Sequence, residues 1–448
     1  MKRTLSILLA LAMVFACVST AFADGEKTDV VWWCTFSGDT AAAVDSMIAD
    51  FNDSQDEYNV IREYQGNASE VMAKLAITSA DDLPAMFSGP VEQTGYFEKT
   101  EYTAMFQDFI DADPEGFDLS VAMVYPQQKG GFGNAEGKMV GFPFGNSFAG
   151  LWYNYDICVA AGVDPEKDLT NLEDIVEACR KVTETGLVEK AIGFQHHGTH
   201  LLNYMGVEGV DVFNNGNGFI EYPTEVLYDS SAKESLTALL QSYQTIYAEG
   251  MGVELGTANS DIAAMLGTGK ICFGLLTISA FHTIIDAANE AGKTIDVGIA
   301  PMPAASRNGR MSGVPAAGTG NFIAACSNEK AQQGAYDFIK FLETPENQAY
   351  IATVTGYLPV GENGSKTELY QEYIKNKFPR AQAALDAQAV SDSDSNCANS
   401  PIATEVINAN ALMMQNVAFD ADYDIDEAIA EAQETLQDAL DLWHLAND

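Results

Sequence analysis

The alternation of strand-like and helix-like segments constrains this chain most. Residues 30–34, 58–64 and 83–87 are short runs rich in aromatic, branched or other apolar residues, as expected of strands. Between them, residues 40–51 and 68–77 repeat apolar side chains at helical spacing. Strands that alternate with helices are typical of an α/β fold with parallel strands. The first part of the chain is therefore predicted to form one α/β unit.

A second unit of the same kind is predicted after an extended crossing. The crossing covers residues 140–154, and the unit holds a strand at 270–276 and helices at 171–185, 232–249 and 278–291. Further sheet is expected at 295–299 and 320–325, and further helix at 329–354 and 426–445. Two α/β units joined by crossings predict a hinged protein whose ligand binds in the cleft between two lobes. Lobe I is predicted to comprise residues 24–140 and 299–355, and lobe II residues 141–298 and 356–448.

The charge of the chain limits its partners. Lys and Arg number 23 against 64 Asp and Glu, which gives a formal net charge of −41. Nucleic acids and anionic membrane surfaces are held by clustered basic residues, so the sequence argues against both. Hydrophobic residues make up 47% of the chain, as in an ordinary globular protein.

The N-terminus has the pattern of an export signal. Lys2 and Arg3 precede an apolar run over residues 5–18, and Ala21-Phe22-Ala23 offers small residues to a signal peptidase. We therefore predict a signal peptide over residues 1–23 and a periplasmic or extracellular protein. The alternative is a lipid anchor on Cys17, although Phe15 stands where a lipoprotein signal has a small residue.

No cofactor or metal site is predicted. Thr268-Gly269-Lys270 lacks the earlier glycine and the following Ser or Thr of a phosphate-binding loop. His196, His197 and His200 form a histidine cluster, which we interpret as a polar loop that lines the cleft. The six cysteines after Cys17 contain no CxxC pair, and their disulfide pairing cannot be read from their spacing.

An ordered set of short segments carries a family resemblance. The segments are Phe51-Asn52-Asp53-Ser54-Gln55, Tyr64-Gln65-Gly66, Gly137-Lys138, Pro143-Phe144, Trp152-Tyr153-Asn154, Ala161-Gly162-Val163-Asp164-Pro165, Pro345-Glu346-Asn347 and Gly356-Tyr357-Leu358-Pro359-Val360. Together they resemble the extracellular solute-binding proteins of ABC importers, and most closely the branch that binds glycerol 3-phosphate. The resemblance implies the type II periplasmic-binding-protein fold and a membrane permease as partner. It also implies a monomer that captures a small polyol, glycerophosphodiester or sugar.

The resemblance also implies a ligand site. Its positions carry over to Tyr64, Glu92, Ser147, either Thr277 or Ser279, Gly318 and Tyr357. In this interpretation the carboxylate accepts hydrogen bonds from ligand hydroxyls, whereas the hydroxyl side chains and a backbone N–H donate to ligand oxygens. Trp33 and Trp152 are candidates for stacking on sugar faces.

One departure from the family pattern bears on the ligand. The phosphate-binding arginine of the family is expected shortly before Asn399-Ser400-Pro401, and this chain has Asn396 there. Without a bidentate cation the strongest phosphate contact is lost, so a glycerophosphodiester or an uncharged sugar fits better than glycerol 3-phosphate. A secreted carbohydrate-active enzyme is the alternative function, but no spacing of carboxylates singles out a catalytic pair.

Overall fold

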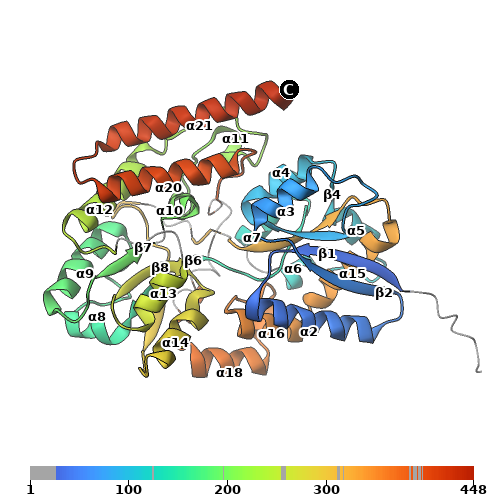
Figure 1. The fold of residues 1–448 in the computed structure, drawn as a ribbon, viewed down its shortest axis with the longest axis horizontal. Helices are drawn as coiled ribbons and strands as arrows, with labels where there is room; N and C mark the ends of the chain where they lie inside the picture. The colour runs from blue at the N-terminus through green and yellow to red at the C-terminus, as the bar shows by residue number, and fades with distance from the viewer. Residues whose placement is uncertain are drawn as a thin grey trace, which may run out of the picture.

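The computed structural model describes residues 27–447, apart from 124–125, 195, 254–258, 310–312, 316, 383–384, 387–390, 392–394 and 396. The predicted signal peptide and Cys17 therefore lie outside the described residues. The described chain forms two α/β units, each built on its own sheet and its own apolar core (Figure 1). We call the unit around the first sheet lobe I and the other lobe II. Two α/β lobes were predicted, and this fold class is confirmed.

Lobe I is built on a six-stranded sheet in the order β2-β1-β3-β10-β4, with β5 paired to β10. β1, β2 and β3 run parallel, whereas β10 is antiparallel to β3, β4 and β5. The elements of this lobe are β1 (Thr28–Cys34), α2 (Gly38–Ser54), β2 (Tyr58–Tyr64), α3 (Ala68–Leu75), β3 (Met86–Pro90), the 3-10 turn η1 (Val91–Gln93), α4 (Thr94–Lys99), β4 (Thr103–Ala104), α5 (Phe106–Ala112), α6 (Leu119–Ala122), α7 (Pro126–Phe132), β5 (Phe142–Pro143), β10 (Thr319–Ala324) and α15 (Glu329–Leu342).

Lobe II is built on a four-stranded sheet in the order β7-β8-β6-β9. β7 and β8 are parallel, and β6 is antiparallel to both β8 and β9. Its strands and helices are β6 (Ala149–Asn154), α8 (Tyr155–Ala161), α9 (Leu172–Thr185), β7 (Ile192–Phe194), α10 (Gly198–Glu208), α11 (Asn214–Asn217), α12 (Lys233–Ala248), α13 (Asn259–Gly267), β8 (Phe273–Thr277), α14 (Ala280–Glu290), β9 (Val297–Pro301), α20 (Ala403–Phe419) and α21 (Ile425–Asn447). The last two helices lie over α10 and α12 (Figure 1).

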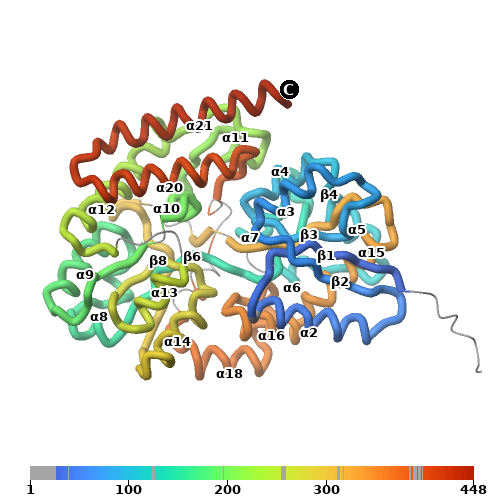
Figure 2. Tube along the Cα trace, in the orientation of Figure 1, coloured from blue at the N-terminus to red at the C-terminus, as the bar shows by residue number. Residues whose placement is uncertain are grey.

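Three further helices follow α15 and lead from lobe I toward lobe II (Figure 2). They are α16 (Pro345–Thr355), α17 (Glu362–Ser365) and α18 (Glu368–Lys377). The helical stretch predicted over residues 329–354 is confirmed, but it is two helices, because α15 ends at Leu342 and a new helix begins at Pro345. Proline cannot continue a helix hydrogen-bond ladder but suits the first position of a new one, where its absent N–H is not needed.

Extended crossing segments connect the lobes. Backbone bridges pair Asn146 with Leu358 and Ser147 with Ala317, and Phe144 N donates to Thr319 O at 3.1 Å. Segments from three distant parts of the chain therefore lie side by side between the two sheets. The residue boundaries predicted for the lobes stay a prediction. Among the described helices, none combines the length and apolar character needed to cross a bilayer.

Candidate functional site

The crossings bring one group of predicted ligand residues together. Ser147 is buried, and its carbonyl oxygen accepts a hydrogen bond from Ala317 N at 3.1 Å. A methyl group added at Gly318 would lie 3.1 Å from Cβ of Ser147, so these two residues touch. The Gly318 carbonyl accepts from Val91 N at 3.2 Å, which brings the η1 turn with Glu92 to the same place. Ser147 and Gly318 therefore touch, and Glu92 follows the residue that is hydrogen-bonded to Gly318, so these three residues form one group.

A second group extends from this one toward lobe II. Tyr357 follows Gly356, and its ring lies 3.0 Å from the position that a methyl group at Gly145 would take. Gly356 has a left-handed φ of 75°. A methyl group added at Gly356 would lie 3.3 Å from Cα of Ser279. Ser279 Oγ in turn lies 3.0 Å from Oγ1 of Thr277, at the end of β8. Thr277 and Ser279, the two alternatives predicted for one ligand position, therefore lie side by side.

Glu92 is the acidic residue of the first group, and its carboxyl has a strongly raised pKa. Burial raises the pKa of its carboxyl from 4.5 to about 7, opposed in part by a hydrogen bond from its own backbone N–H. Its charge in turn contributes to a raised pKa at Cys397, whose main cause is burial. Because Cys397 packs in the core of lobe II, Glu92 of lobe I lies near the opposite lobe. Cys397 Sγ also donates to Oδ1 of Asn203 at 3.5 Å.

A second contact between the lobes lies beside Glu92. A methyl group at Gly95 in α4 would fall 1.8 Å from Nδ2 of Asn399, and one at Gly218 would fall 1.9 Å from the Asn399 carbonyl oxygen. Asn399 N donates to Asn217 O at 3.0 Å. Asn399 is therefore fixed to lobe II through its backbone and packs its amide on a glycine of lobe I. The lobes are in contact in this structure.

Two predicted ligand residues stand apart. Tyr64 ends β2, in register with Cys34 of β1, and its side chain is 56% exposed. The contacts that join the described residues of the two groups do not extend to it. Asn396 lies outside the described residues, although its neighbours Ser395 and Cys397 are buried. The roles of Tyr64 and Asn396 stay predictions.

Trp152 does not form the expected sugar platform. Trp152 is fully buried, stacks on Phe378 with ring centroids 5.1 Å apart, and donates from Nε1 to Thr277 O at 3.1 Å. The predicted stacking of Trp152 on a ligand is wrong, because the ring belongs to the core beneath β8. One face of Trp33 is covered by Lys74, whose Nζ lies 3.7 Å from the ring centroid.

The histidine cluster is also placed differently from the prediction. His196 is buried among aromatic rings, and its Nε2 lies 2.8 Å from the hydroxyl of Tyr247. Burial lowers the pKa of His196 to about 4, so this imidazole is neutral at physiological pH. The interpretation as a cleft-lining polar loop is wrong for His196, which packs against Phe419 of α20. Within the described part of the chain, no three His, Cys, Asp or Glu residues are arranged to hold a metal ion.

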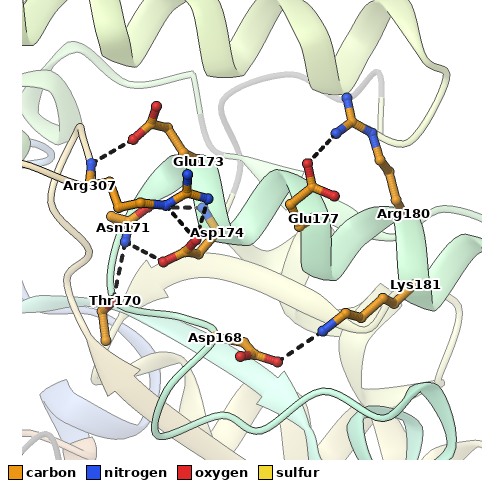
Figure 3. A network of polar contacts seen from close by, with 9 residues as sticks. All are labelled: Asp168, Thr170, Asn171, Glu173, Asp174, Glu177, Arg180, Lys181 and Arg307. Carbon is orange, nitrogen blue, oxygen red and sulfur yellow. Dashed lines mark hydrogen bonds and ion pairs between the residues drawn. The ribbon is translucent and has the colours of Figure 1, made fainter.

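The arginines that the structure describes are all engaged by carboxylates. Arg62 pairs with Asp45, and Arg380 forms two hydrogen bonds with Asp296, each at 2.7 Å. Figure 3 shows two more on lobe II. There Arg307 pairs with Asp174 at 2.5 Å, and Arg180 pairs with Glu177 at the same distance and with Glu249. Since these guanidinium groups already have anionic partners, none is a free cation for a phosphate.

The family follows from a comparison of the whole chain with protein families. The model of the bacterial extracellular solute-binding proteins matches residues 46–377. The chain belongs to this family. One relative is the sn-glycerol-3-phosphate-binding periplasmic protein UgpB of Rhizobium meliloti (strain 1021), 22% identical over 449 residues, with 98% of this chain and 99% of that protein covered. UgpB of Agrobacterium fabrum (strain C58) is 23% identical, with 98% of each chain covered.

Solved structures share the fold of this solute-binding protein. UgpB from Mycobacterium tuberculosis, solved in complex with glycerophosphocholine, superposes with a TM-score of 0.72 and 19% identity, covering 93% of this chain and 99% of that one. The sugar-binding protein MalE from Xanthomonas citri superposes with a TM-score of 0.72 and 17% identity, covering 94% of this chain and 100% of that one. At such identities the likeness shows the fold and not the ligand.

Sequence reasoning did not place Asn203, Cys397 and Asn399 beside this site. Asn203 contacts Cys397, the charge of Glu92 acts on Cys397, and Asn399 contacts Gly95. The one sequence feature that points to this region is the Asn399-Ser400-Pro401 segment, which marks where the phosphate-binding arginine of the family was expected.

Proposed function

We propose that this protein captures a small polyol-type solute outside the cytoplasm and delivers it to the membrane permease of an ABC importer. Membership of the solute-binding family supports capture, and the UgpB relatives are periplasmic proteins by name. We propose that the protein acts as a monomer and binds without chemistry. The observation that carries the proposal is the polar group formed by Glu92, Ser147, Gly318, Tyr357 and Ser279 at the crossings between two lobes.

The chemistry of this group suits a ligand rich in hydroxyls. An ionised Glu92 accepts hydrogen bonds from hydroxyl groups, and Ser279, Thr277 and Tyr357 each have a hydroxyl that can donate or accept. None of these side chains is a cation. A phosphate monoester carries close to two negative charges at neutral pH and is costly to bury without a positive partner. We therefore propose a sugar or a zwitterionic glycerophosphodiester as ligand, in preference to glycerol 3-phosphate.

Titration calorimetry tests this proposal on the full mature protein. The probes are glycerophosphocholine, glycerol 3-phosphate, maltose and glucose, and the recovered ligand is analysed for hydrolysis products. We expect one probe class to bind and to be recovered unchanged, with glycerol 3-phosphate the weaker of the two glycerol-based ligands. Tighter binding of glycerol 3-phosphate would contradict the charge argument, and hydrolysis of maltose would favour a carbohydrate-active enzyme.

Matched variants test the site itself. Ser279→Ala removes a hydroxyl beside Gly356 and Thr277 and is expected to weaken ligand binding by about tenfold, in line with a lost hydrogen bond. Thr283→Ala changes an exposed residue of α14, the helix that begins directly after Ser279, and is expected to leave the ligand affinity unchanged. Equal ligand affinities for both variants would show that Ser279 does not belong to the ligand site.

A further inference from the structure

Two buried thiols of lobe II lie against each other. The Sγ atoms of Cys158 and Cys272 are 3.7 Å apart, and both side chains are fully buried. Cys158 lies in α8, whereas Cys272 directly precedes β8. The two residues are 114 positions apart in the sequence, so the fold alone brings them together.

The backbone holds this pair in place. β6 and β8 are antiparallel neighbours with Tyr153 opposite Phe273, and Asn154 N donates to Cys272 O at 2.9 Å. α8 starts directly after β6, with Asn154 as its N-cap, so its first turns are anchored beside the start of β8. The thiols are therefore presented to each other by one sheet and the helix that follows it.

We propose that Cys158 and Cys272 form a disulfide bond when the chain folds in an oxidising compartment. Each thiol loses its hydrogen as the sulfur–sulfur bond forms, and a disulfide oxidant R–S–S–R is reduced to two R–SH. A sulfur–sulfur bond is about 2.05 Å long, so the two sulfurs must approach by about 1.7 Å. That approach joins two side chains that are already in contact.

A third buried thiol, that of Cys179, lies near this pair. Cys179 of α9 interacts electrostatically with both residues, but the sulfur contact joins Cys158 and Cys272. Burial raises the pKa of the Cys179 and Cys272 thiols, which disfavours the reactive thiolate once the core has closed. The exchange is therefore expected during folding, before the core excludes the oxidant.

The bond would stabilise lobe II without touching the ligand site. Cys272 lies at the opposite end of β8 from Thr277, and Cys158 packs in the core. Closing a loop of this length restricts the unfolded chain, and we expect the oxidised protein to melt about 5 °C or more above the reduced protein. Ligand affinity is expected to be the same in both forms.

Peptide mapping decides the proposal directly. The full chain is refolded from denaturant in a glutathione redox buffer, and in parallel with excess reductant, then alkylated under denaturing conditions and cut with trypsin without reduction. Cleavage after lysine and arginine puts Cys158, Cys179 and Cys272 in separate peptides, over residues 139–167, 168–180 and 271–293. We expect peptides 139–167 and 271–293 to be joined in the oxidised sample and 168–180 to be alkylated.

Two variants complete the test. Cys179→Ser is expected to keep the cross-link and the reductant-sensitive melting temperature, whereas Cys158→Ser is expected to lose both. Alkylation of all six thiols of the mature chain after oxidative refolding would overturn the proposal, and so would a link from Cys158 to Cys179. The wild-type protein measured with and without reductant gives the same answer if a variant folds poorly. Ligand binding is measured separately, so failure of the proposed function would be distinct.

Discussion

Replacing Glu92 by glutamine is expected to remove a pH-dependent loss of stability. Burial raises the pKa of this carboxyl from 4.5 to about 7 in the folded protein. The folded state therefore binds this proton more tightly than the unfolded chain does. Below pH 4.5 the group is protonated in both states and costs nothing. Between pH 4.5 and about 7 the unfolded chain releases the proton while the folded state keeps it, so the folded state loses stability until its own carboxyl ionises.

The size of the effect follows from the two pKa values. A difference of one unit corresponds to 1.36 kcal/mol, so a shift from 4.5 to about 7 corresponds to about 3–4 kcal/mol at most. Most of this loss falls between pH 5 and pH 8. Glutamine has a similar shape but no charge, so Glu92→Gln is expected to gain up to about 3–4 kcal/mol on wild type over that range.

Thermal unfolding at pH 5, 6, 7 and 8 measures this gap. Other titrating groups are shared by the two proteins, so the difference between their melting temperatures isolates Glu92. Glu101→Gln removes an exposed carboxyl from the same lobe and serves as the control, with a flat difference expected. A melting-temperature gap for Glu92→Gln that does not widen with pH would refute the reasoning.

Three further outcomes are expected. Gly95→Ala places a methyl group on the Asn399 amide, so it is expected to separate the lobes and weaken ligand binding about tenfold by calorimetry; unchanged affinity would contradict a contact between lobes. Trp152→Ala is expected to cost about 3–5 kcal/mol in urea unfolding, because it empties a core site against Phe378; a cost below 1 kcal/mol would contradict its burial. Saturating ligand is expected to reduce the pH-dependent gap between wild type and Glu92→Gln, because ligand hydroxyls stabilise the carboxylate; an unchanged gap would place Glu92 outside the site.

Local pattern was enough for the fold class. The strand at Tyr58–Tyr64 was predicted to the residue, and the helix at Leu172–Thr185 to within one residue, because apolar spacing and an Asn171 cap act within a few residues. The strand predicted at 83–87 instead forms at Met86–Pro90. Pro84 lacks the N–H that a strand interior needs, and the shift follows from that.

The candidate site was less accessible to sequence reasoning, because its geometry depends on contacts between distant segments. The resemblance named Glu92, Ser147 and Gly318, but only the crossings show that Ser147 touches Gly318 and that Val91, next to Glu92, is hydrogen-bonded to Gly318. Nothing in the sequence indicates that Trp152 is covered by Phe378 or that His196 is surrounded by aromatic rings. A ring's spacing along a chain does not tell which neighbours will bury it.

Small-angle X-ray scattering with and without ligand tests the central claim most directly. The lobes are in contact through Gly95 and Asn399 in the structure, so a ligand that binds between them is expected to favour this compact form. We predict a smaller radius of gyration at saturating ligand than in its absence. An unchanged radius of gyration, with calorimetry on the same sample showing saturation, would contradict capture by closure of two lobes.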